Sequence, residues 1–254
     1  GVRINVKNRT YAHHLSFVDQ TLQRSIARAG VIRPVVLLEA AARYVMVSGF
    51  RRLHCQTTCR RKTIHAIILT RSDFTEKQLF LASVADNHPL SYTDLEKAII
   101  LEKALKEFHM SEVEGVGSVG PLIGIGAVPQ VVADLRAVLC LSRTLQNAIH
   151  EGILPYRMGL RIGQWHRKDQ DIFLQSIMRR CIFSTSELKM LLTYLEESAK
   201  KENKTIRSLI GDSAIGGLIR HDARTPRENA SVCLDIFRMR LLPRMSMLEK
   251  HYKA

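Results

Sequence analysis

The stretch VMVSGFRRLHC, residues 45–55, decides the predicted fold because the pattern changes inside it. Its first four residues have the character of a strand, Gly49 follows, and Arg51 and Arg52 open a segment typical of a helix. A strand that runs through a glycine turn into a helix leaves several backbone N–H groups pointing outward, and these groups favour an anion. Two arginines at such a turn add donors suited to phosphate oxygens. The turn therefore indicates either a phosphate site or two solvated arginines on a basic helix.

The segments on either side of this turn predict a small α/β domain over residues 1–90. Asp19 can cap a helix and Gly30 can end it, so a helix is expected between them. The run RPVVLLE predicts a buried strand with Pro34 at its start, where a missing N–H is tolerated. The remaining elements expected here are strands at 44–48 and 63–69 and helices at 51–61 and 73–87.

The rest of the chain is predicted to be helical. Thr93 and Glu96 form a capping box at the start of the predicted helix LEKAIILEKALKEF, which mixes apolar and charged residues. Further helices are expected at residues 128–139, 144–151, 155–164, 170–180, 186–203 and 232–252. Short helices joined by short turns are typical of a helix-turn-helix bundle. The predicted fold class is thus α+β, with a helix-turn-helix domain at 91–181 and a C-terminal helical region at 182–254.

The chain carries a strong positive charge that is concentrated near its N-terminus. Its 254 residues hold 38 lysines and arginines against 24 aspartates and glutamates, a net charge of +14. Residues 1–90 hold 14 basic against 5 acidic side chains, whereas residues 91–181 hold 11 against 10. Such an excess indicates a polyanionic partner, which could be nucleic acid, nucleotide phosphates or an anionic membrane face. Its placement directs attention to the arginines of the glycine turn.

Several classes of protein are disfavoured by composition. Every apolar run stays below the roughly 18 residues that a membrane span needs, and the N-terminal residues do not have the pattern of a signal peptide. No membrane partner is therefore expected. Five scattered cysteines indicate reduced thiols in a cytosolic protein. A zinc site at His54, Cys55, Cys59 and His65 is disfavoured because the spacing matches no standard ligand pair.

Asp86 and Asn87 lie at a predicted helix end, just before Pro89 and a newly capped helix. A carboxylate beside a carboxamide could hold a Mg²⁺ ion that bridges phosphates. The simpler alternative is a helix end followed by a turn.

The segment GVGSVGPLIGIG, residues 115–126, contains the spacing of a dinucleotide fingerprint. Such a fingerprint must follow a strand directly, and a predicted helix precedes this one. A flexible loop is therefore expected here.

The order of four segments resembles the ParB family of chromosome and plasmid partition proteins over about residues 19–195. SIARAGVIRPVVL (25–37) is similar to the first box of that family, and SGFRRL (48–53) to its G-E-R-R box. DNHPLSYTDLEKA (86–98) resembles the E-N-x-x-R box with the N-P-x-E-E-A that follows it, and residues 131–163 resemble the helix-turn-helix segment. The resemblance implies a ParB/sulfiredoxin-like N-terminal domain followed by a helix-turn-helix domain.

The resemblance also implies a mechanism and its residues. In this family the N-terminal domain binds CTP with Mg²⁺, the central domain reads a centromere-like site on duplex DNA, and nucleotide closes a homodimer into a clamp. A partition ATPase as partner and a cytoplasmic, nucleoid-associated location follow from the same resemblance. The nucleotide would be held by Gly30, Pro34, Ser48, Gly49, Arg51, Arg52 and Asn87, with Asp86 as the catalytic carboxylate and Asp86 and Asn87 at the metal. DNA contacts would come from Gln130, Arg136, Arg143, Arg157 and Arg161.

This chain departs from the family pattern at several positions. The box glutamate is Phe50, the acidic residue of the third box is the shorter Asp86, and its arginine position is Leu90. Such a pocket is expected to bind nucleotide and to hydrolyse it slowly or not at all. The glycine-rich loop takes the place of the usual first helix-turn-helix elements. Arg136 is the only basic residue of the helix at 128–139, so sequence-specific DNA binding is expected to be narrowed or lost.

One other function remains open at this point, and two more are disfavoured. The chain could be a ParB-like adaptor that binds a partner protein in a nucleotide-dependent way with weak or no specific DNA binding. A sulfiredoxin-like repair of cysteine needs a cysteine at the position of Phe50 and is disfavoured. A nuclease is disfavoured as well, because no cluster of carboxylates suits a two-metal site.

Overall fold

The computed structural model describes residues 4–5, 7–40, 43–87, 92–126, 128–179 and 183–211. The chain forms two compact units, Gly1–Leu139 and Cys140–Ala254, and each is considered by itself. The predicted helix at 232–252 and Leu90 lie outside the described residues. No helix within the described ranges is long and apolar enough to cross a membrane.

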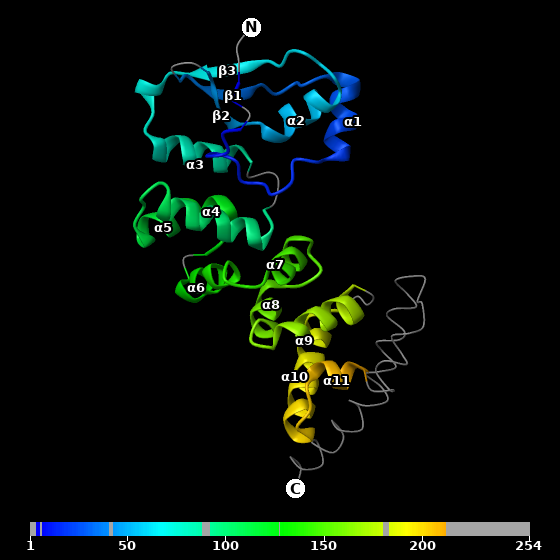
Figure 1. The fold of residues 1–254 in the computed structure, drawn as a ribbon. Helices are drawn as coiled ribbons and strands as arrows, with labels where there is room; N and C mark the ends of the chain where they lie inside the picture. Colours follow the sequence, from blue (N-terminus) through cyan, green and yellow to red (C-terminus); the bar gives the residue numbers. More distant parts are fainter. Residues whose placement is uncertain are drawn as a thin grey trace. The chain divides into compact units, whose positions relative to one another are not determined.

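A three-stranded sheet forms the centre of the N-terminal part of the first unit (Figure 1). The strands are β1 (Val35–Leu38), β2 (Val45–Ser48) and β3 (Ala66–Leu69), in the order β2-β1-β3. β1 runs antiparallel to β2 and parallel to β3. β1 and β2 are almost wholly buried, as their apolar runs predict, whereas most of β3 is exposed. The three predicted strands are therefore confirmed, and β3 is shorter than expected.

Four helical elements precede, connect and follow these strands. They are α1 (Gln20–Ala29), α2 (Phe50–Thr58), the 3₁₀ turn η1 (Arg71–Asp73) and α3 (Glu76–Asp86). Asp19 caps α1 by accepting from the Leu22 N–H, and the helix ends at Gly30 with φ +78°, as predicted. α3 begins later than predicted because Thr75 and Gln78 form its capping box. α2 packs against β1 and α3 against β2 (Figure 1).

The first unit continues with α4 (Asp94–Lys106), α5 (Glu112–Ile123) and α6 (Pro129–Val138). The capping box of Thr93 and Glu96 is present at the start of α4, and α6 has its proline in the first turn, both as predicted. The flexible loop predicted at residues 115–126 is wrong, because most of this segment forms α5. Ser111 caps that helix, and Gly124 ends it in the left-handed conformation.

One hydrophobic core joins the sheet to the helices that follow residue 90. Phe80 of α3 stacks on Phe108 just beyond α4, with ring centroids 4.2 Å apart. The same cluster of buried side chains includes Leu38, Val47, Leu79, Val84, Ile100, Ala104, Val119 and Ile123. The sheet therefore shares its core with α3, α4 and α5. The three-domain division made from the sequence stays a prediction, and the boundary at residue 90 falls within this core.

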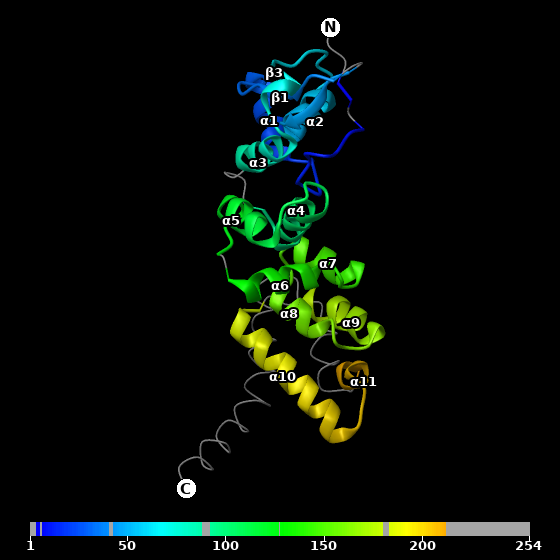
Figure 2. The same cartoon turned by 90° about the vertical axis from the view of Figure 1, so that its left-hand side faces the viewer.

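The described residues of the second unit, 140–179 and 183–211, are mostly helical. Its elements are α7 (Arg143–His150), α8 (Tyr156–Ile162), α9 (Arg167–Phe173), a π-helical turn at Leu174–Met178, α10 (Thr185–Glu202) and α11 (Ile206–Gly211). α10 is capped by a reciprocal pair, Ser184 and Glu187, and ends at Asn203 in the left-handed conformation. α11 packs against α9 and α10 (Figure 2). The mixed α+β fold class predicted for the whole chain is confirmed.

Candidate functional site

The glycine turn between β2 and α2 has the geometry of an anion site. Gly49 is the N-cap of α2 and has φ +98°, a conformation that glycine adopts without strain. A Cβ at this position would lie 2.6 Å from Cγ1 of Val35, so the turn packs directly on β1. Among the described residues no side chain caps α2, which leaves its first backbone N–H groups to another acceptor. These groups and the helix dipole favour a negative charge at the turn.

Asp86, at the end of α3, lies among three donors beside this turn. Arg33 and Ser48 both donate to its carboxylate, and Arg52 Nη2 donates to Oδ2 at 3.0 Å. The side chain of Asp86 is 15% exposed and that of Arg33 is 64% exposed. Two cations therefore converge on one carboxylate at a site that solvent reaches from the Arg33 side.

Arg52 is held in place by the loop before β1. Its Nη1 donates to the carbonyl oxygen of Arg33 at 2.8 Å and also to that of Pro34. Burial lowers the pKa of Arg52 and the charge of Arg33 adds to this effect, while Asp86 opposes both. The guanidinium is thus fixed by main-chain acceptors on one side and by a carboxylate on the other. A group held in this way is already oriented for a planar, multidentate contact with an anion.

Arg51 points to a different carboxylate. It forms an ion pair with Asp19, the N-cap of α1, and both side chains are about one-fifth exposed. The Nε of Arg51 is buried and has no hydrogen-bond partner in the described part of the chain. Asp19 therefore caps α1 and neutralises Arg51 at the same time.

Phe50 occupies an aromatic cluster in the first turn of α2. Its ring stacks on Phe17 with centroids 5.7 Å apart. The guanidinium of Arg9 lies 4.5 Å from the Phe17 ring centroid and 5.8 Å from that of Phe50. Phe50 takes the position of the glutamate in the G-E-R-R box. It makes an apolar contact there and supplies no carboxylate to the site.

The remaining predicted nucleotide and metal residues are placed as follows. Pro34 contributes its carbonyl oxygen to Arg52, whereas Gly30 lines a separate pocket. Asn87 ends α3 and its Nδ2 donates to the Ser83 carbonyl at 2.8 Å. Asp86 is the acidic residue directly before Asn87. The described residues contain no group of three histidine, cysteine, aspartate or glutamate side chains that could hold a metal ion. The residues present suit a Mg²⁺ ion only if phosphate oxygens complete its coordination.

Sequence reasoning missed two members of this site, Arg33 and Asp19. Arg33 lies directly before Pro34 in the first family-like box, and Asp19 was interpreted only as a helix cap. Their partners Asp86 and Arg51 are 53 and 32 residues away in the chain. The only local signal was an arginine at the start of a predicted strand.

A comparison with protein-family models identifies the domain that carries this site. Residues 12–84 match the model described as the ParB N-terminal domain. The chain carries a ParB N-terminal domain. The match covers the turn with Ser48, Gly49, Arg51 and Arg52 and stops just before Asp86. It confirms the resemblance to the ParB family that the sequence boxes indicated.

Curated relatives agree with this assignment at low identity. The chain is 22% identical over 184 residues to stage 0 sporulation protein J of Bacillus subtilis, covering 72% of this chain and 62% of that protein. It is 26% identical over 160 residues to the probable chromosome-partitioning protein ParB of Helicobacter pylori, covering 63% and 52%. A nucleoid occlusion protein of Halalkalibacterium halodurans is 26% identical over 133 residues, which cover 52% and 44%. The chain thus spans less than two thirds of the length of these relatives.

Two solved structures of Caulobacter crescentus ParB, both C-terminally truncated, were also found. The crystal structure in complex with the centromeric parS site has a TM-score of 0.43 and 16% identity, covering 71% of this chain and 91% of that one. The structure complexed with CTP-γ-S has a TM-score of 0.29 and 18% identity, covering 68% and 93%.

Beyond the ParB N-terminal domain, the five predicted DNA-binding residues are divided between the two units. Gln130 and Arg136 lie on α6 in the first unit. Gln130 Nε2 donates to Asp134 at 2.7 Å, and Arg136 lies 3.7 Å from Glu102 of α4. The basic residue of α6 is thus partly neutralised by its own unit.

Arg143, Arg157 and Arg161 belong to the second unit, where Arg143 and Arg157 are exposed. Arg161 is different, because its Nη2 donates to Glu196 at 2.7 Å and to Thr193 at 2.9 Å. Trp165 Nε1 donates to the same carboxylate at 3.0 Å. Arg161 therefore links α8 to α10, and its role in DNA contact stays a prediction.

Proposed function

We propose that this chain is a ParB-like switch that binds CTP with Mg²⁺ at the turn between β2 and α2 and associates with duplex DNA. The convergence of Arg33 and Arg52 on Asp86, beside the uncapped start of α2, carries this proposal. Such an arrangement suits a phosphate site whose two arginines are neutralised by Asp86. The choice of CTP as the nucleotide rests on the resemblance to the ParB family.

The site suggests how nucleotide would change the local contacts. Arg33 and Arg52 now share Asp86, and Arg51 is paired with Asp19. A triphosphate at the turn offers these arginines a stronger acceptor than one carboxylate, because it carries several negative charges and more acceptor oxygens. Asp86 would then be released to hold the metal together with Asn87. Breaking the Arg51–Asp19 pair would also loosen the cap of α1, which gives the fold a route from phosphate binding to helix movement.

The proposal predicts weak hydrolysis at most. Asp86 is the carboxylate assigned to catalysis and metal binding, while Phe50 fills the box glutamate position with an apolar ring. A single carboxylate that must also neutralise arginines is a poor activator of water. We therefore expect the bound nucleotide to be retained and turned over slowly or not at all.

Calorimetric titration with CTP, ATP, GTP and UTP in the presence of Mg²⁺ tests this function. We expect CTP to bind selectively to the natural chain and expect binding to be lost in Arg52→Ala. Arg71→Ala is the matched control, because Arg71 is an exposed arginine and its substitution removes the same positive charge. Equal binding of all nucleotides, or binding that survives Arg52→Ala, would contradict the proposed site.

We further propose a homodimer that closes on a centromere-like DNA site, works with a partition ATPase and is located at the nucleoid in the cytoplasm. α5, the Gly124 turn and α6 follow one another as the two helices of a helix-turn-helix do, with the second helix able to enter the major groove. In this proposal the motif begins at α5, before the segment 131–163 to which the sequence assigned it, because residues 115–123 are helical. α6 presents Gln130 and Arg136 for such a contact. These features support a DNA partner in addition to the nucleotide.

A second candidate function is a nucleotide-dependent adaptor with little DNA affinity. It is favoured by the internal neutralisation of Arg136 by Glu102 and of Arg161 by Glu196. Phosphate contacts supply much of the affinity of DNA-binding proteins, and each one adds to the salt dependence of binding. Fluorescence anisotropy with a mixed-sequence duplex, from about 50 to 200 mM salt and with or without CTP, separates the two functions. Steep salt dependence that weakens in Arg143→Ala supports the DNA switch, whereas negligible binding at low salt supports the adaptor.

A further inference from the structure

Strand β3 forms one edge of the sheet, and its outer main-chain groups face away from the other strands (Figure 1). Among the described elements β3 pairs with β1, in the order β2-β1-β3. The carbonyl oxygens of His65 and Leu69 accept hydrogen bonds of 3.0 and 2.9 Å from N–H groups at the start of β1 and just beyond its end. Main-chain groups alternate in direction along a strand, so those of Ala66 and Ile68 point away from β1. They offer donors and acceptors to an additional strand.

The sequence of β3 lacks the features that usually protect an edge. Natural edge strands carry charged residues or proline, which discourage pairing with another chain. β3 has the sequence AIIL, in which Ile67 is 51% exposed and Ile68 is 47% exposed. The residues opposite them on β1 are largely buried, with Leu37 only 1% exposed. An apolar edge strand of this kind is typical of a surface that another strand covers.

A cavity of about 440 Å³ lies on one face of the sheet at this edge. Ile68 lines the cavity, whereas Ile67 points to the opposite face because side chains alternate along a strand. The other aliphatic side chains that line the cavity are those of Ile4, Leu37, Leu53, Ile64 and Ala66. The cavity therefore suits an apolar side chain from a strand added beside β3. It does not include Gly30 or the turn at 48–52, which follows β2 at the opposite edge of the sheet.

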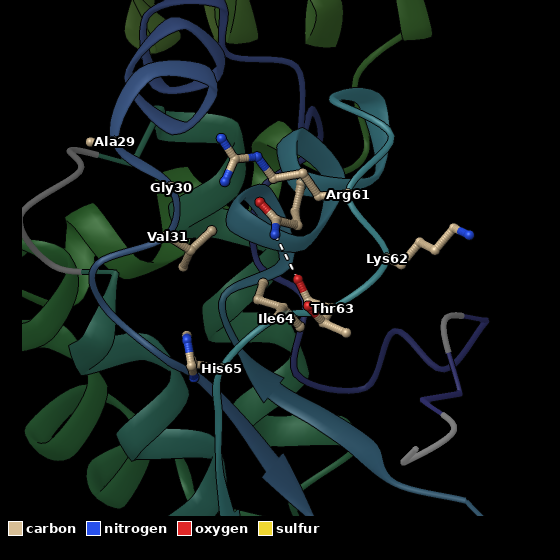
Figure 3. Close-up of a pocket in the computed structure, with 9 residues that line it drawn as sticks. Ala29, Gly30, Val31, Arg61, Lys62, Thr63, Ile64 and His65 are labelled. Carbon is tan, nitrogen blue, oxygen red and sulfur yellow. Dashed lines mark hydrogen bonds between the residues drawn. The ribbon is translucent and has the colours of Figure 1, made fainter.

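The chain around β3 is basic. Between Glu39 and Asp73 it carries seven lysines and arginines and no acidic residue. Arg61 and Lys62, which precede β3, line the cavity together with the apolar residues. Figure 3 shows Lys62 extending away from Gly30, so its ammonium group is directed away from the end of α1. A partner that enters this cavity therefore meets positive charge at the end where β3 begins.

The two ends of β3 differ in how their charges are compensated. Beyond the C-terminal end, Arg71 donates to the carboxylate of Glu76 at 3.1 Å. Before the N-terminal end, Arg61 donates to the Ala27 carbonyl at 3.1 Å, a neutral acceptor that leaves the positive charge uncompensated. A carboxylate from a partner is therefore favoured beside Arg61 and Lys62 rather than beside Arg71.

We propose that β3 is the docking edge for an extended segment of a partner protein that combines alternating apolar residues with acidic residues at one end. The segment adds a strand beside β3, places an apolar side chain in the cavity next to Ile68 and brings its carboxylates to Arg61 and Lys62. A second copy of this chain is disfavoured at this edge, because residues 1–90 carry 14 basic against 5 acidic side chains. Nucleic acid is disfavoured as well, because exposed isoleucines and a strand edge offer little to a phosphate backbone.

Labelled peptides test the docking. EEEVTVTV carries an acidic end and alternating valines, and KKKVTVTV replaces the glutamates by lysines. EEEVPPTV keeps the charge but replaces two neighbouring strand residues by proline, so that whichever of them faces β3 loses its N–H. Each peptide is also made in reverse order, because the segment can add parallel or antiparallel to β3. Fluorescence anisotropy with the natural chain measures the affinities.

We expect EEEVTVTV or its reverse to bind saturably, about tenfold more tightly than the matched lysine and proline peptides. The preference over the lysine peptide should shrink as salt rises from about 50 to 150 mM, because the carboxylate contacts are exposed and screened. The preference over the proline peptide should persist, because it arises from main-chain hydrogen bonds.

Variants of the chain separate the apolar contact from the charge contact. Ile68→Ser should weaken binding of the acidic peptide about fivefold, whereas Val113→Ser should not, since Val113 is an 85% exposed residue of α5. Lys62→Glu should weaken binding of EEEVTVTV and strengthen that of KKKVTVTV. Lys201→Glu makes the same charge change at an exposed lysine of α10 and should do neither. Circular dichroism verifies that each variant is folded.

Three results would overturn the proposal. These are the absence of saturable binding by either acidic peptide, equal binding of the proline peptide, and equal effects of Ile68→Ser and Val113→Ser. A DNA duplex that displaces the peptide and loses affinity in Lys62→Glu but not in Ile68→Ser would assign the edge to nucleic acid instead. A dimer in sedimentation that dissociates in Ile68→Ser would assign it to a second copy of the chain.

This docking does not depend on nucleotide binding at the glycine turn. Arg52→Ala should leave the preference for the acidic peptide over the proline peptide unchanged, and loss of that preference would place the peptide at the nucleotide site. Failure of the chain to bind CTP, with peptide binding intact, would contradict only the proposed function.

Discussion

Gly49 links the packing of the sheet to the chemistry of the turn. Its φ of +98° and the 2.6 Å approach of a built Cβ to Val35 impose two separate constraints. The left-handed conformation costs an L-residue about 1–2 kcal/mol, and overpacking a rigid site costs about 1–3 kcal/mol more. Only glycine satisfies both, which places the start of α2 directly on β1.

Gly49→Ala is therefore expected to lower the free energy of unfolding by about 3 kcal/mol. Gly124→Ala is the matched control in the same unit, because Gly124 has φ +69° and nothing within 4 Å of a built Cβ among the described residues. The control should lose only about 1 kcal/mol, from the backbone alone. Urea denaturation followed by circular dichroism measures both, and equal losses would mean that the approach to Val35 is not limiting.

His13 is a buried neutral base at the junction of the N-terminal segment with α3. Its Nε2 lies 2.7 Å from Ser83 Oγ, and that hydroxyl donates to the Phe80 carbonyl at 2.6 Å. The imidazole therefore donates through Nε2, while Nδ1 is buried without a partner in the described residues. Burial lowers the pKa of His13 to about 3, and the charges of Lys103 and His14 add to this effect.

Acid should destabilise the first unit through this residue. The unfolded chain binds a proton below the ordinary pKa of 6.5, whereas the folded chain stays neutral down to about 3, so stability is lost as pH falls through this window. Between about pH 7 and pH 5 the loss should be about 2 kcal/mol, and His13→Asn should reduce it. Denaturant midpoints at the two pH values measure the difference, and an unchanged pH dependence in the variant would assign it to other groups.

Glu96 adds a second acid-sensitive contact at lower pH. Burial by itself would raise its pKa, but hydrogen bonds from His14 and from the backbone N–H groups of Thr93 and Leu15 lower it to about 2. Its stabilising contribution is fully present above the ordinary value of 4.5 and is lost as pH falls toward 2. Above pH 4.5 the contribution of Glu96 to stability is constant, so Glu96 does not affect the comparison of pH 7 with pH 5 for His13.

At the scale of the element, α5 demonstrates how packing overrides a glycine-rich composition. Gly115 lies 3.1 Å, measured from a built Cβ, from Leu105 of α4, and Gly120 lies 3.2 Å from the Ile125 carbonyl. Both are buried, whereas Gly117 is exposed with nothing within 4 Å among the described residues. Two of these glycines therefore allow close contact, and the third only costs helix stability.

Gly117→Ala should stabilise the chain by about 1 kcal/mol, because alanine loses less backbone entropy in a helix. Gly120→Ala has the same intrinsic helix benefit but must displace a backbone carbonyl, so we expect no gain or a net loss. Thermal denaturation of the two variants provides the comparison. A gain in both would mean that α5 tolerates a side chain at the Ile125 contact.

At the scale of the whole molecule, the first core determines which fragment can fold. Phe80, Val84 and Leu79 of α3 share one cluster with Ile100 of α4 and Val119 of α5. A chain cut at residue 90 would expose the half of that cluster that α4 and α5 cover. At about 25 cal/mol for each Å² of apolar surface, about 200 Å² of such exposure costs about 5 kcal/mol, which is the lower end of the usual stability of a protein.

A fragment of residues 1–139 should therefore unfold cooperatively, and a fragment of residues 1–90 should not. Both keep the same beginning, so the comparison isolates α4, α5 and α6. Amide dispersion in NMR spectra and the sharpness of urea denaturation measure the outcome. A well-folded 1–90 fragment would support the domain boundary that the sequence suggested.

Much of this structure was predictable because its signals are local. The caps at Asp19 and Thr93, the proline in the first turn of α6 and the buried run of β1 depend on a few neighbouring residues, and each lies where the pattern predicts. The glycine turn was equally visible, since a strand, a glycine and a helix follow one another. Short-range sterics and hydrogen bonding determine such features before any tertiary contact forms.

Other features depend on residues that are distant in the chain. Asp86 meets Arg33 and Ser48 across 53 and 38 residues, and no spacing rule connects them. Gly115 and Gly120 lie in a helix that packs closely on Leu105 and Ile125, and the amide of Gln56 is oriented because its Nε2 donates to the Thr63 carbonyl. Sequence therefore determined the caps, the strands and the glycine turn between β2 and α2. Tertiary packing decided which carboxylate neutralises which arginine, because burial makes those long-range pairings stronger than any local preference.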